Sequence, residues 1–234
     1  MDTENKAIGK PKIHVVIVAA GKGKRFGGDL PKQFKLLGDR PVLMHTVIRV
    51  ARTMPTANIV MVLGHDYVQY WERMCEIYGF VSPRVVEGGD TRWQSVKNAL
   101  ATLSAAPNDI IMVHDGVRPV VNTDMIHRIL TGLETNDAVV PYISVTDSLR
   151  RIDGDTSHSV DRSRLVAVQT PQAFRADKLL EAYDLAYSDK YTDDASVYEA
   201  AGFGAPALVE GSSQNIKVTR PRDIDIAALF MGIR

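Results

Sequence analysis

Residues 13–28 read IHVVIVAAGKGKRFGG, an apolar run followed directly by a basic loop rich in glycine. Apolar side chains at consecutive positions are typical of a strand buried on both faces, which is where a parallel sheet places its strands. Glycines behind such a strand let the backbone approach a bound group closely, and exposed amides there bind phosphate. Residues 13–19 are therefore predicted to form the first strand of a parallel α/β sheet, with a candidate phosphate loop at residues 21–28.

Strand and helix patterns alternate along the rest of the chain. Short apolar runs predict strands at residues 58–63, 84–86, 109–114 and 137–141. Apolar spacings of three and four predict helices at residues 41–51, 66–78, 91–103 and 123–133. Helices at 175–187 and 193–201, strand-like segments at 207–210 and 216–218, and a closing helix from Pro221 follow. This alternation favours the α/β class, with a doubly wound, mostly parallel sheet of Rossmann-like type.

Residues 143–168 interrupt the alternation. The segment is polar, and Asp153-Gly154 within it is a hairpin-type turn signal between apolar residues such as Leu149 and Val160. We therefore expect a β-arm that projects from the body. Residues 13–234 then form a single domain with this arm inserted at about residues 143–168. The polar residues 1–12 lack the apolar core of a signal peptide and are expected to form a flexible tail.

Composition narrows the range of partners. The 28 Lys and Arg balance the 28 Asp and Glu, so no overall field attracts nucleic acid or an anionic membrane. The single cysteine, Cys75, excludes an internal disulfide and multi-cysteine metal sites, and it suits a reducing compartment. The longest apolar run, residues 15–20, is far shorter than the roughly 20 residues of a membrane span. We expect a cytoplasmic protein that binds small molecules rather than nucleic acid or membranes.

The loop after the first strand carries Lys22, Lys24 and Arg25, and Pro31-Lys32-Gln33 adds another cation nearby. Its G-x-G-x-x-x-G spacing fits neither the dinucleotide fingerprint nor the P-loop. Several cations beside flexible amides match a triphosphate better than a dinucleotide. On these residues alone, a tight turn or a solvated basic loop remains the alternative.

Two further residues occupy positions where a ligand is expected. Asp115 stands at the carboxyl end of a predicted buried strand, beside Arg118, where it is either a ligand of Mg²⁺ on phosphate oxygens or a helix cap. Lys217 lies in a predicted strand among apolar neighbours, so it either binds an anion or extends its amine to the surface. His114 is interpreted as a buried core histidine without a role.

A set of specific motifs runs in order from about Ile13 to the C-terminus. They are Ala19-Ala20-Gly21-x-Gly-x-Arg25, Pro31-Lys32-Gln33, Gly88-Gly89-Asp90-x-Arg92-x-x-Ser95-Val96, His114-Asp115-x-x-Arg118-Pro119, Asp161-Arg162, Gln169-Thr170-Pro171-Gln172-x-Phe174, Thr192-Asp193-Asp194 and Asn215-Ile216-Lys217-x-Thr219. Their order closely resembles the 2-C-methyl-D-erythritol 4-phosphate cytidylyltransferase family.

The resemblance implies a Rossmann-like nucleotidyltransferase. Its substrates would be CTP and a polyol phosphate, methylerythritol 4-phosphate, and its products the CDP-alcohol and pyrophosphate of the non-mevalonate isoprenoid pathway. Such a reaction requires no general base, because a phosphate monoester with a second pKa near 6 is mostly ionised at pH 7. It requires neutralisation of charge where two anions meet. The implied cofactor is Mg²⁺ or another divalent cation.

The resemblance also assigns roles to site residues. Arg25 and Lys32 would stabilise the reacting α-phosphate, while Arg162 and Lys217 would position the substrate phosphate. The expected nucleotide site is lined by Ala19, Ala20, Gly21, Gly23, Gly89, Asp90 and Ser95. The expected substrate site comprises Asp115, Arg118, Ser148 and Thr170, and Asp115 is also the candidate metal ligand.

Two positions depart from the family pattern. Ser148 stands where the family usually has threonine, which keeps the hydroxyl but removes the β-branch that fixes its rotamer. Gly116 stands where the family has alanine, and we expect it to widen the site slightly. Asp193 belongs to the motif Thr192-Asp193-Asp194, and we interpret it as a helix cap because it stands at the start of a predicted helix.

The arm predicts a homodimer. An isolated two-stranded ribbon is marginal in water, so we expect two arms to exchange about a two-fold axis. The resemblance implies that Arg162 of each arm reaches the active site of the partner chain.

Three other functions remain alternatives at this point. They are a ribitol 5-phosphate cytidylyltransferase with the same chemistry, a nicotinamide-dependent oxidoreductase, and a non-catalytic nucleotide-binding regulator. A nicotinamide-dependent oxidoreductase is expected to have an acidic residue at the end of the second strand, where it binds the ribose of the dinucleotide. This chain has Leu63-Gly64-His65 there. Pyrophosphate release from CTP separates the regulator from the enzymes.

Overall fold

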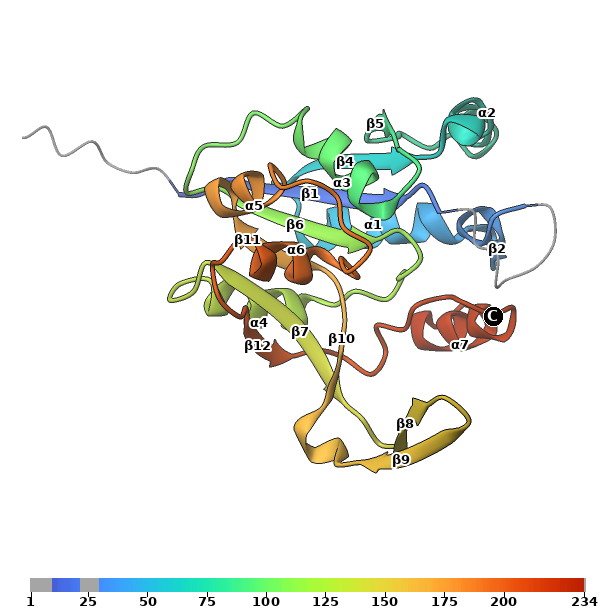
Figure 1. The fold of residues 1–234 in the computed structure, drawn as a ribbon. Helices are drawn as coiled ribbons and strands as arrows, with labels where there is room; N and C mark the ends of the chain where they lie inside the picture. Colours follow the sequence, from blue (N-terminus) through green and yellow to red (C-terminus); the bar gives the residue numbers. More distant parts are fainter. Residues whose placement is uncertain (1–9, 22–29, 234) are drawn as a thin grey trace, which may run out of the picture.

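The computed structural model describes residues 10–21 and 30–233 (Figure 1). Within these residues an eight-stranded sheet forms the centre of the molecule, in the order β10-β7-β11-β6-β1-β4-β5 with β12 beside β7. The strands are β1 (Ile13–Ala19), β4 (Asn58–Leu63), β5 (Arg84–Glu87), β6 (Ile110–Asp115), β7 (Ala138–Ser144), β10 (Val166–Val168), β11 (Gln172–Arg175) and β12 (Ala207–Glu210). β1 pairs in parallel with β4 and β6, and β4 pairs in parallel with β5.

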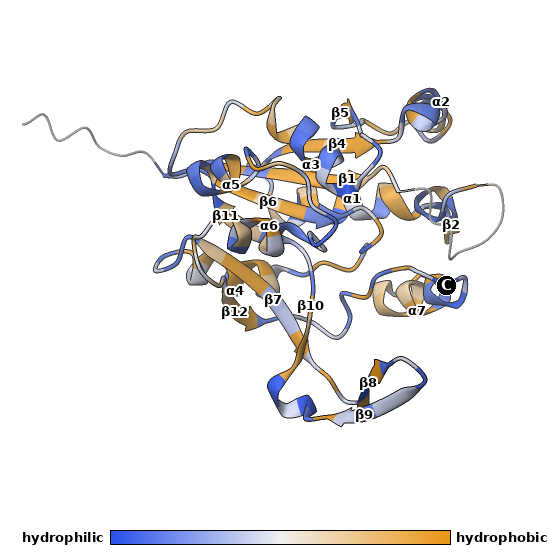
Figure 2. Ribbon diagram, viewed as in Figure 1, coloured by the Kyte–Doolittle hydropathy of each residue, from blue (hydrophilic) through white to orange (hydrophobic). Residues whose placement is uncertain are grey.

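Helices cover both faces of this sheet. One face carries α1 (Val42–Thr53), α2 (Val68–Tyr78) and α4 (Thr123–Gly132), and the other carries α3 (Arg92–Leu100), α5 (Ala176–Ala182) and α6 (Asp194–Ala200). Val15 and Ile17 of β1 pack in the first core and Val16 in the second, as expected for a strand buried on both sides. Figure 2 shows β1, β4 and β6 as largely hydrophobic strands. The predicted doubly wound α/β class is confirmed.

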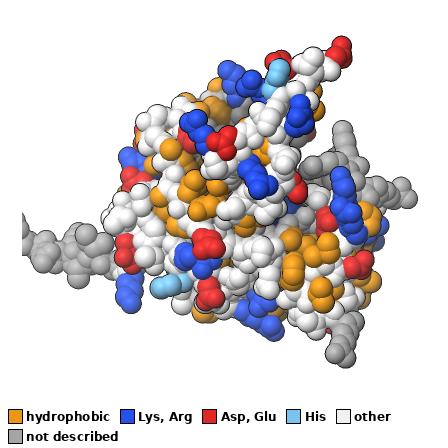
Figure 3. Space-filling view, turned by 90° about the horizontal axis from the view of Figure 1, so that it is seen from below, with side chains coloured by type: hydrophobic (Ala, Val, Ile, Leu, Met, Phe, Trp, Pro, Cys, Tyr) orange, Lys and Arg blue, Asp and Glu red, His pale blue; other side chains and the backbone are white. Residues whose placement is uncertain are grey.

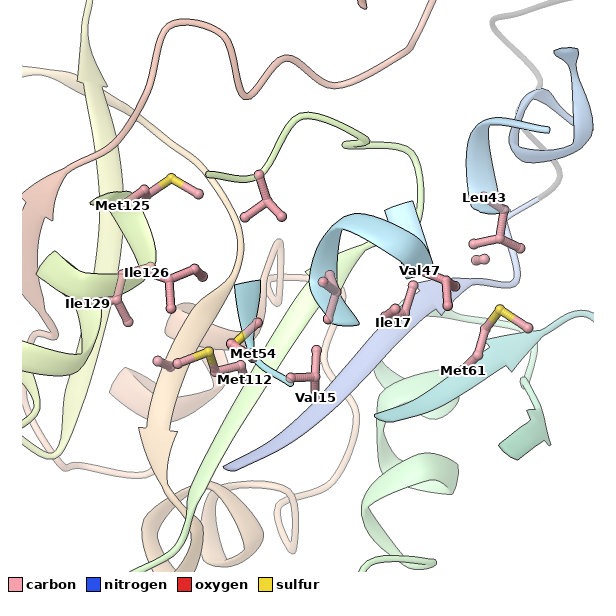
Figure 4. Close-up of a cluster of buried hydrophobic side chains, with 14 of the residues drawn as sticks. Val15, Ile17, Leu43, Val47, Met54, Met61, Met112, Met125, Ile126 and Ile129 are labelled. Atoms are coloured by element: carbon pink, nitrogen blue, oxygen red, sulfur yellow. The ribbon is translucent and has the colours of Figure 1, made fainter. Parts of the chain in front are cut away.

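The larger core lies between the sheet and the first group of helices. In Figure 4, Val15 and Ile17 of β1 lie among side chains from α1 and β6, including Leu43, Val47 and Met112. Each of these five side chains is at most 4% exposed. Burying a side chain of this size contributes about 1.5–3 kcal/mol. The packing therefore fixes where the carboxyl ends of the central strands lie.

Several elements differ from the sequence predictions. β11 lies antiparallel between β6 and β7, so this side of the sheet is mixed. The sequence pattern does not show this strand, because its first residue, Gln172, is polar. The Gln172 side chain is nevertheless buried, since it forms hydrogen bonds with Asp193 and with the amide of Ala195. The predicted strand at residues 216–218 is wrong, since the segment is irregular and is tied to the body where Val218 N donates to Val117 O. Helix α5 ends at Ala182, earlier than predicted.

β8 (Leu149–Asp153) and β9 (Thr156–Val160) form a separate two-stranded sheet that stands apart from the main sheet in Figure 1. The turn between them lies at the predicted position, with Gly154 at φ +58°. The 3-10 helix η3 (Arg162–Arg164) and strand β10 lead the chain back to β7. Residues 145–165 are named the arm below. Ile152 on it is 80% exposed and Leu165 41%, so the arm buries little of its apolar surface.

Smaller elements complete the molecule. They are β2 (Leu36–Leu37), β3 (Arg40–Pro41), the 3-10 helices η1 (Lys32–Phe34) and η2 (His65–Tyr67), and helix α7 (Arg222–Met231). α7 packs with Leu37, Val42 and Val218 in a third small core. In the part of the chain that is described, no helix combines the length and apolar character that crossing a membrane requires.

Candidate active site

A cavity of about 780 Å³ lies at the carboxyl ends of β1, β4, β5 and β6. Its walls are residues 18–21 at the end of β1, residues 64–67 after β4, residues 88–92 after β5, and Asp115 at the end of β6, with Lys32, Gln33, Ser95, Val117 and Lys217. Open α/β sheets bind their ligands at this edge. The volume is within the usual range for small-molecule sites.

The residues predicted from the sequence fall into three groups. Those on the cavity wall are Ala19, Ala20, Gly21, Lys32, Gly89, Asp90, Ser95, Asp115 and Lys217. Those that do not line it are Arg118, Ser148, Arg162 and Thr170. Gly23 and Arg25 lie outside the described residues. The described residues that were predicted to form the nucleotide site thus lie together on one cavity wall. The two arm residues, Ser148 and Arg162, are exposed and do not line this cavity.

The loop after β5 is held by Ser95. Its hydroxyl accepts a hydrogen bond from Gly89 N at 3.2 Å and donates to Thr91 O at 2.9 Å. A Cβ at Gly88 would lie 2.6 Å from Ala20 Cβ, so glycine is required for the close approach of this loop to the one after β1. Ser95 is 1% exposed and therefore shapes the cavity wall from behind.

Asp115 is the centre of a charged cluster. Its Oδ2 lies 3.0 Å from Lys217 Nζ and 3.1 Å from Arg118 Nε. Burial alone would raise the pKa of Asp115, but the neighbouring Lys217 and Arg118 hold it well below its usual range. Asp115 is therefore an anion at neutral pH. It is the partner that the sequence predicted Lys217 to need, although Lys217 stands in an irregular segment and not in a strand.

A hydrogen-bond chain fixes Asp115 from behind. Burial lowers the pKa of His114 to about 4, so the ring is neutral. Its Nε2 lies 3.1 Å from Arg118 O, which only accepts, so Nε2 carries the proton and Nδ1 accepts from Thr170 Oγ1 at 3.0 Å. Thr170 Oγ1 in turn accepts from Asp115 N at 3.0 Å. The structure therefore gives Thr170 a supporting position, and His114, interpreted as without a role, holds both Thr170 and Arg118.

Arg118 supports the same cluster. Besides Asp115, its guanidinium bonds Asn215 O at 2.8 Å, and Asn215 Nδ2 donates to Thr170 O at 2.8 Å. The segment that carries Lys217 is thus tied to the end of β6. Arg118 therefore supports the cavity through its ion pair with Asp115 and through the segment that carries Lys217.

Arg92 lines the cavity, although its place in a sequence motif predicted no role for it. At the start of α3, it forms a bidentate ion pair with Asp194 of α6, at 3.0 and 2.5 Å. Asp194 is fully buried and also accepts from Tyr183 Oη at 2.6 Å, and the Tyr183 ring stacks on Trp93 with centroids 5.8 Å apart. Burial opposes the charge, but the carboxylate of Asp194 keeps the pKa of Arg92 above its ordinary value. The R-x-x-S spacing of Arg92 and Ser95 was the available signal.

Two further expectations are resolved by geometry. Asp193 caps α6 as predicted: its side chain accepts from Ser196 N, and Ser196 Oγ accepts from Asp193 N in a capping box. The expectation for Gly116 is wrong. A Cβ there would lie 2.9 Å from Ala19 Cβ and 3.0 Å from Leu43 Cδ1, so Gly116 packs against the core and does not widen the cavity.

The fold and this cavity define a Rossmann-like nucleotidyltransferase. A solved structure of 2-C-methyl-D-erythritol 4-phosphate cytidylyltransferase from Francisella tularensis superposes with a TM-score of 0.78 at 27% identity, covering 94% of this chain and 99% of that one. The family model described as IspD, 2-C-methyl-D-erythritol 4-phosphate cytidylyltransferase, matches residues 13–232. The chain belongs to this family, which confirms the resemblance.

Curated relatives support the same membership. A 2-C-methyl-D-erythritol 4-phosphate cytidylyltransferase of Porphyromonas gingivalis is 47% identical over 225 residues, 95% of this chain and 99% of the relative. One from Azobacteroides pseudotrichonymphae is 42% identical over 215 residues, 92% of this chain and 96% of the relative. The similarity therefore spans the body and the arm alike.

Proposed function

We propose that this protein transfers the cytidylyl group of CTP to 2-C-methyl-D-erythritol 4-phosphate. The products are 4-diphosphocytidyl-2-C-methyl-D-erythritol and pyrophosphate, and the step serves isoprenoid precursor synthesis. The observation that carries this proposal is the cavity at the carboxyl edge of the sheet, where Lys32, Lys217 and Arg92 surround a glycine-walled space. Family membership supplies the identity of the substrates.

The chemistry follows from charge. An oxygen of the methylerythritol phosphate attacks the α-phosphorus of CTP, and the bond from that phosphorus to the β-phosphate oxygen breaks. Pyrophosphate leaves with the bonding electron pair. No base is required, since the attacking phosphate is mostly a dianion at pH 7. Cations must lower the repulsion between the two anions and stabilise charge on the α-phosphate, which is the role we assign to Lys32 and Arg25.

Lys217 suits the task of holding the second substrate's phosphate. An ammonium group carries three donors, and its ion pair with Asp115 uses one of them. The ion pair fixes the Nζ at 3.0 Å from a buried carboxylate, so the remaining donors are presented at a defined place on the cavity wall. Asp115 then contacts the sugar alcohol or a metal ion, as proposed from the sequence.

The residues fit a divalent cation that arrives with the nucleotide. Among the described residues no group of three or more acidic, histidine or cysteine side chains converges as a metal cage. Mg²⁺ usually keeps several waters and is held by one or two carboxylates together with substrate phosphates, and Asp115 is a suitable single carboxylate. When bound, the ion would neutralise phosphate charge. We propose Mg²⁺ as the cofactor on this basis.

We propose that the working form is a homodimer with exchanged arms, located in the cytoplasm. Arg162 and Ser148 are exposed on the arm and do not line the cavity of their own protomer. Figure 3, viewed from the side of the arm, shows apolar side chains exposed among charged ones. Ile152, Leu165 and Val168 are 80%, 41% and 43% exposed, and a second arm would cover them. The Arg162 guanidinium would then join the partner's cavity.

The test is pyrophosphate release with purified protein and Mg²⁺. We expect release from CTP with 2-C-methyl-D-erythritol 4-phosphate, and none from CTP alone. ATP in place of CTP and ribitol 5-phosphate in place of methylerythritol phosphate serve as matched controls. A preference for ribitol 5-phosphate, or equal use of ATP, would contradict the proposal. CTP binding without any turnover would favour a regulator.

A further inference from the structure

Gln33 occupies the wall of the cavity between Lys32 and the loop after β1. Its side chain is buried, with 2% exposure. Its amide nitrogen donates to Ala19 O at 2.7 Å and to Gly21 O at 3.1 Å. Both hydrogens of the amide are therefore used on the backbone that ends the first strand.

The short helix η1 directs its three side chains, those of Lys32, Gln33 and Phe34, toward three different surroundings. A 3-10 helix has three residues per turn, so successive side chains point about 120° apart. Lys32 lines the cavity, Gln33 bonds the loop, and Phe34 packs into the core against Tyr70 and Trp71, with ring centroids 5.1 and 6.5 Å away. Phe34 thus anchors the helix to α2, and Gln33 anchors it to residues 19–21 at the end of β1.

The two bonds have an electrostatic consequence. A carbonyl oxygen carries partial negative charge, so a carbonyl that faced the cavity would repel a phosphate. The bonds to Gln33 hold the oxygens of Ala19 and Gly21 toward the side-chain amide. Because the C=O and N–H of one peptide group point in opposite directions, they also turn the N–H of Ala20 to the side away from Gln33. Backbone N–H groups in such loops are what binds phosphate.

We propose that Gln33 is a positioning residue for the triphosphate, one that holds the carbonyls of Ala19 and Gly21 away from the phosphates and couples this stretch of backbone to Lys32. The proposal rests on the proposed function, since it takes the cavity's ligand to be CTP. Glutamine suits the role because its amide offers two donors without charge at the required reach. Glutamate has the same shape but offers carboxylate oxygens, which repel both carbonyls.

The test compares nucleotides that differ in the number of phosphates. Dissociation constants of CTP and CMP are measured by calorimetry for the wild-type protein and for Gln33→Glu. We expect CTP binding to weaken at least about tenfold, which is about 1.4 kcal/mol, and CMP binding to change less than about threefold. In turnover assays, kcat should fall while the KM for the polyol phosphate stays the same.

Gln169→Glu is the matched control. Gln169 is 4% exposed, and its amide also donates to two backbone carbonyls, Ser212 O at 2.8 Å and Asn215 O at 3.4 Å, but it does not line the cavity. It should lose stability yet keep the wild-type ratio of CTP to CMP affinity. Should Gln33→Glu not fold, Gln33→Asn keeps the amide with a shorter reach and should show the same loss for CTP.

Three results would decide against the proposal. CTP binding unchanged in the Gln33 variants would overturn it, and so would an equal loss for CTP and CMP, since a merely structural role predicts the latter. These results leave the proposed function intact. A wild-type protein that binds no CTP would instead overturn the proposed function and this inference with it.

Discussion

Asp115 illustrates how single residues set up this site. A buried carboxylate is costly unless it is paired and hydrogen-bonded, and here Lys217 and Arg118 both contact Oδ2. The pairing keeps the pKa of Asp115 well below its ordinary value and gives each cation a fixed position. The carboxylate therefore acts as a template that holds positive groups where an anionic substrate would otherwise have to order them.

Lys32 provides the most direct test at this scale. We expect Lys32→Ala to lower kcat about 10²–10³-fold, because losing one donor aimed at developing charge has that typical effect. Lys35→Ala, three residues away and off the cavity wall, is the control and should keep wild-type kcat. Steady-state rates of pyrophosphate release provide the measurement. Near-normal kcat in Lys32→Ala would mean that the lysine is an ordinary surface charge.

His114 makes stability depend on pH. Burial lowers its pKa in the folded state to about 4, below the unfolded value of 6.5, so the unfolded chain binds the extra proton first as pH falls. Stability should be fully present above about pH 6.5 and decline by about 3 kcal/mol on the way to pH 4. Denaturant unfolding at several pH values measures this. In His114→Gln, which cannot titrate, the decline across this window should be smaller, and an equal decline would contradict the assignment.

At the scale of elements, the start of α6 joins two neighbouring aspartates with different tasks. Asp193 caps the helix, whereas Asp194 turns inward and holds Arg92 at the cavity wall. Gln172 of β11 bonds both Asp193 and the amide of Ala195, so the antiparallel strand fixes the same helix end. A helix far along the sequence thereby sets the position of a cation beside the nucleotide loop.

The two aspartates should separate experimentally. Asp194→Asn removes one partner of a buried ion pair and should destabilise by about 3 kcal/mol, the lower end of the usual range because the Arg92 side chain is 30% exposed. Asp193→Asn, the control, should cost about 1 kcal/mol or less, with little change in activity. Unfolding free energies in denaturant compare them. Equal losses for both variants would contradict this division of tasks.

The sequence predicts these elements unequally. β1, β4 and α4 were found with ends within one residue, because consecutive apolar runs and three-four spacings are strong signals. β11 was not predicted, because its first residue, Gln172, is polar and yet is buried by hydrogen bonds. The irregular segment around Lys217 was wrongly predicted as a strand, because Ile216-Lys217-Val218 has strand-like composition but pairs with no neighbouring strand. Most residues of the cavity wall lie in motifs that the sequence shows, whereas residues 64–67, which follow β4, lie in none of them. The mutual support of the wall residues, such as Arg92 on Asp194, depends on contacts that span 102 positions.

At the scale of the whole molecule, the proposed arm exchange predicts complementation. Arg162→Ala and Lys32→Ala dimers should each be nearly inactive, because each lacks one cation at both sites. A mixed dimer should regain one working site, which takes Lys32 from one chain and Arg162 from the other. Activity after co-refolding, with heterodimers counted by differential tags, measures this.

The control uses another exposed arginine of the arm. Arg151→Ala should be active as a homodimer, since Arg151 makes no predicted contact with substrate. Mixed with Lys32→Ala, it should give activity only in proportion to the intact sites. If heterodimers form and the Arg162→Ala and Lys32→Ala mixture stays inactive, Arg162 acts within its own chain.

The placement of the two tryptophans gives the protein an internal optical probe. The sequence contains only Trp71 and Trp93. Trp71 packs against Phe34 behind the lysine-bearing helix η1, and Trp93 stacks on the Tyr183 ring that holds Asp194. One indole therefore stands behind each wall of the cavity, shielded from solvent at 0% and 8% exposure. Trp71→Phe leaves Trp93 as the single tryptophan, so tryptophan fluorescence would follow the Arg92 wall alone as nucleotide enters, without any attached dye.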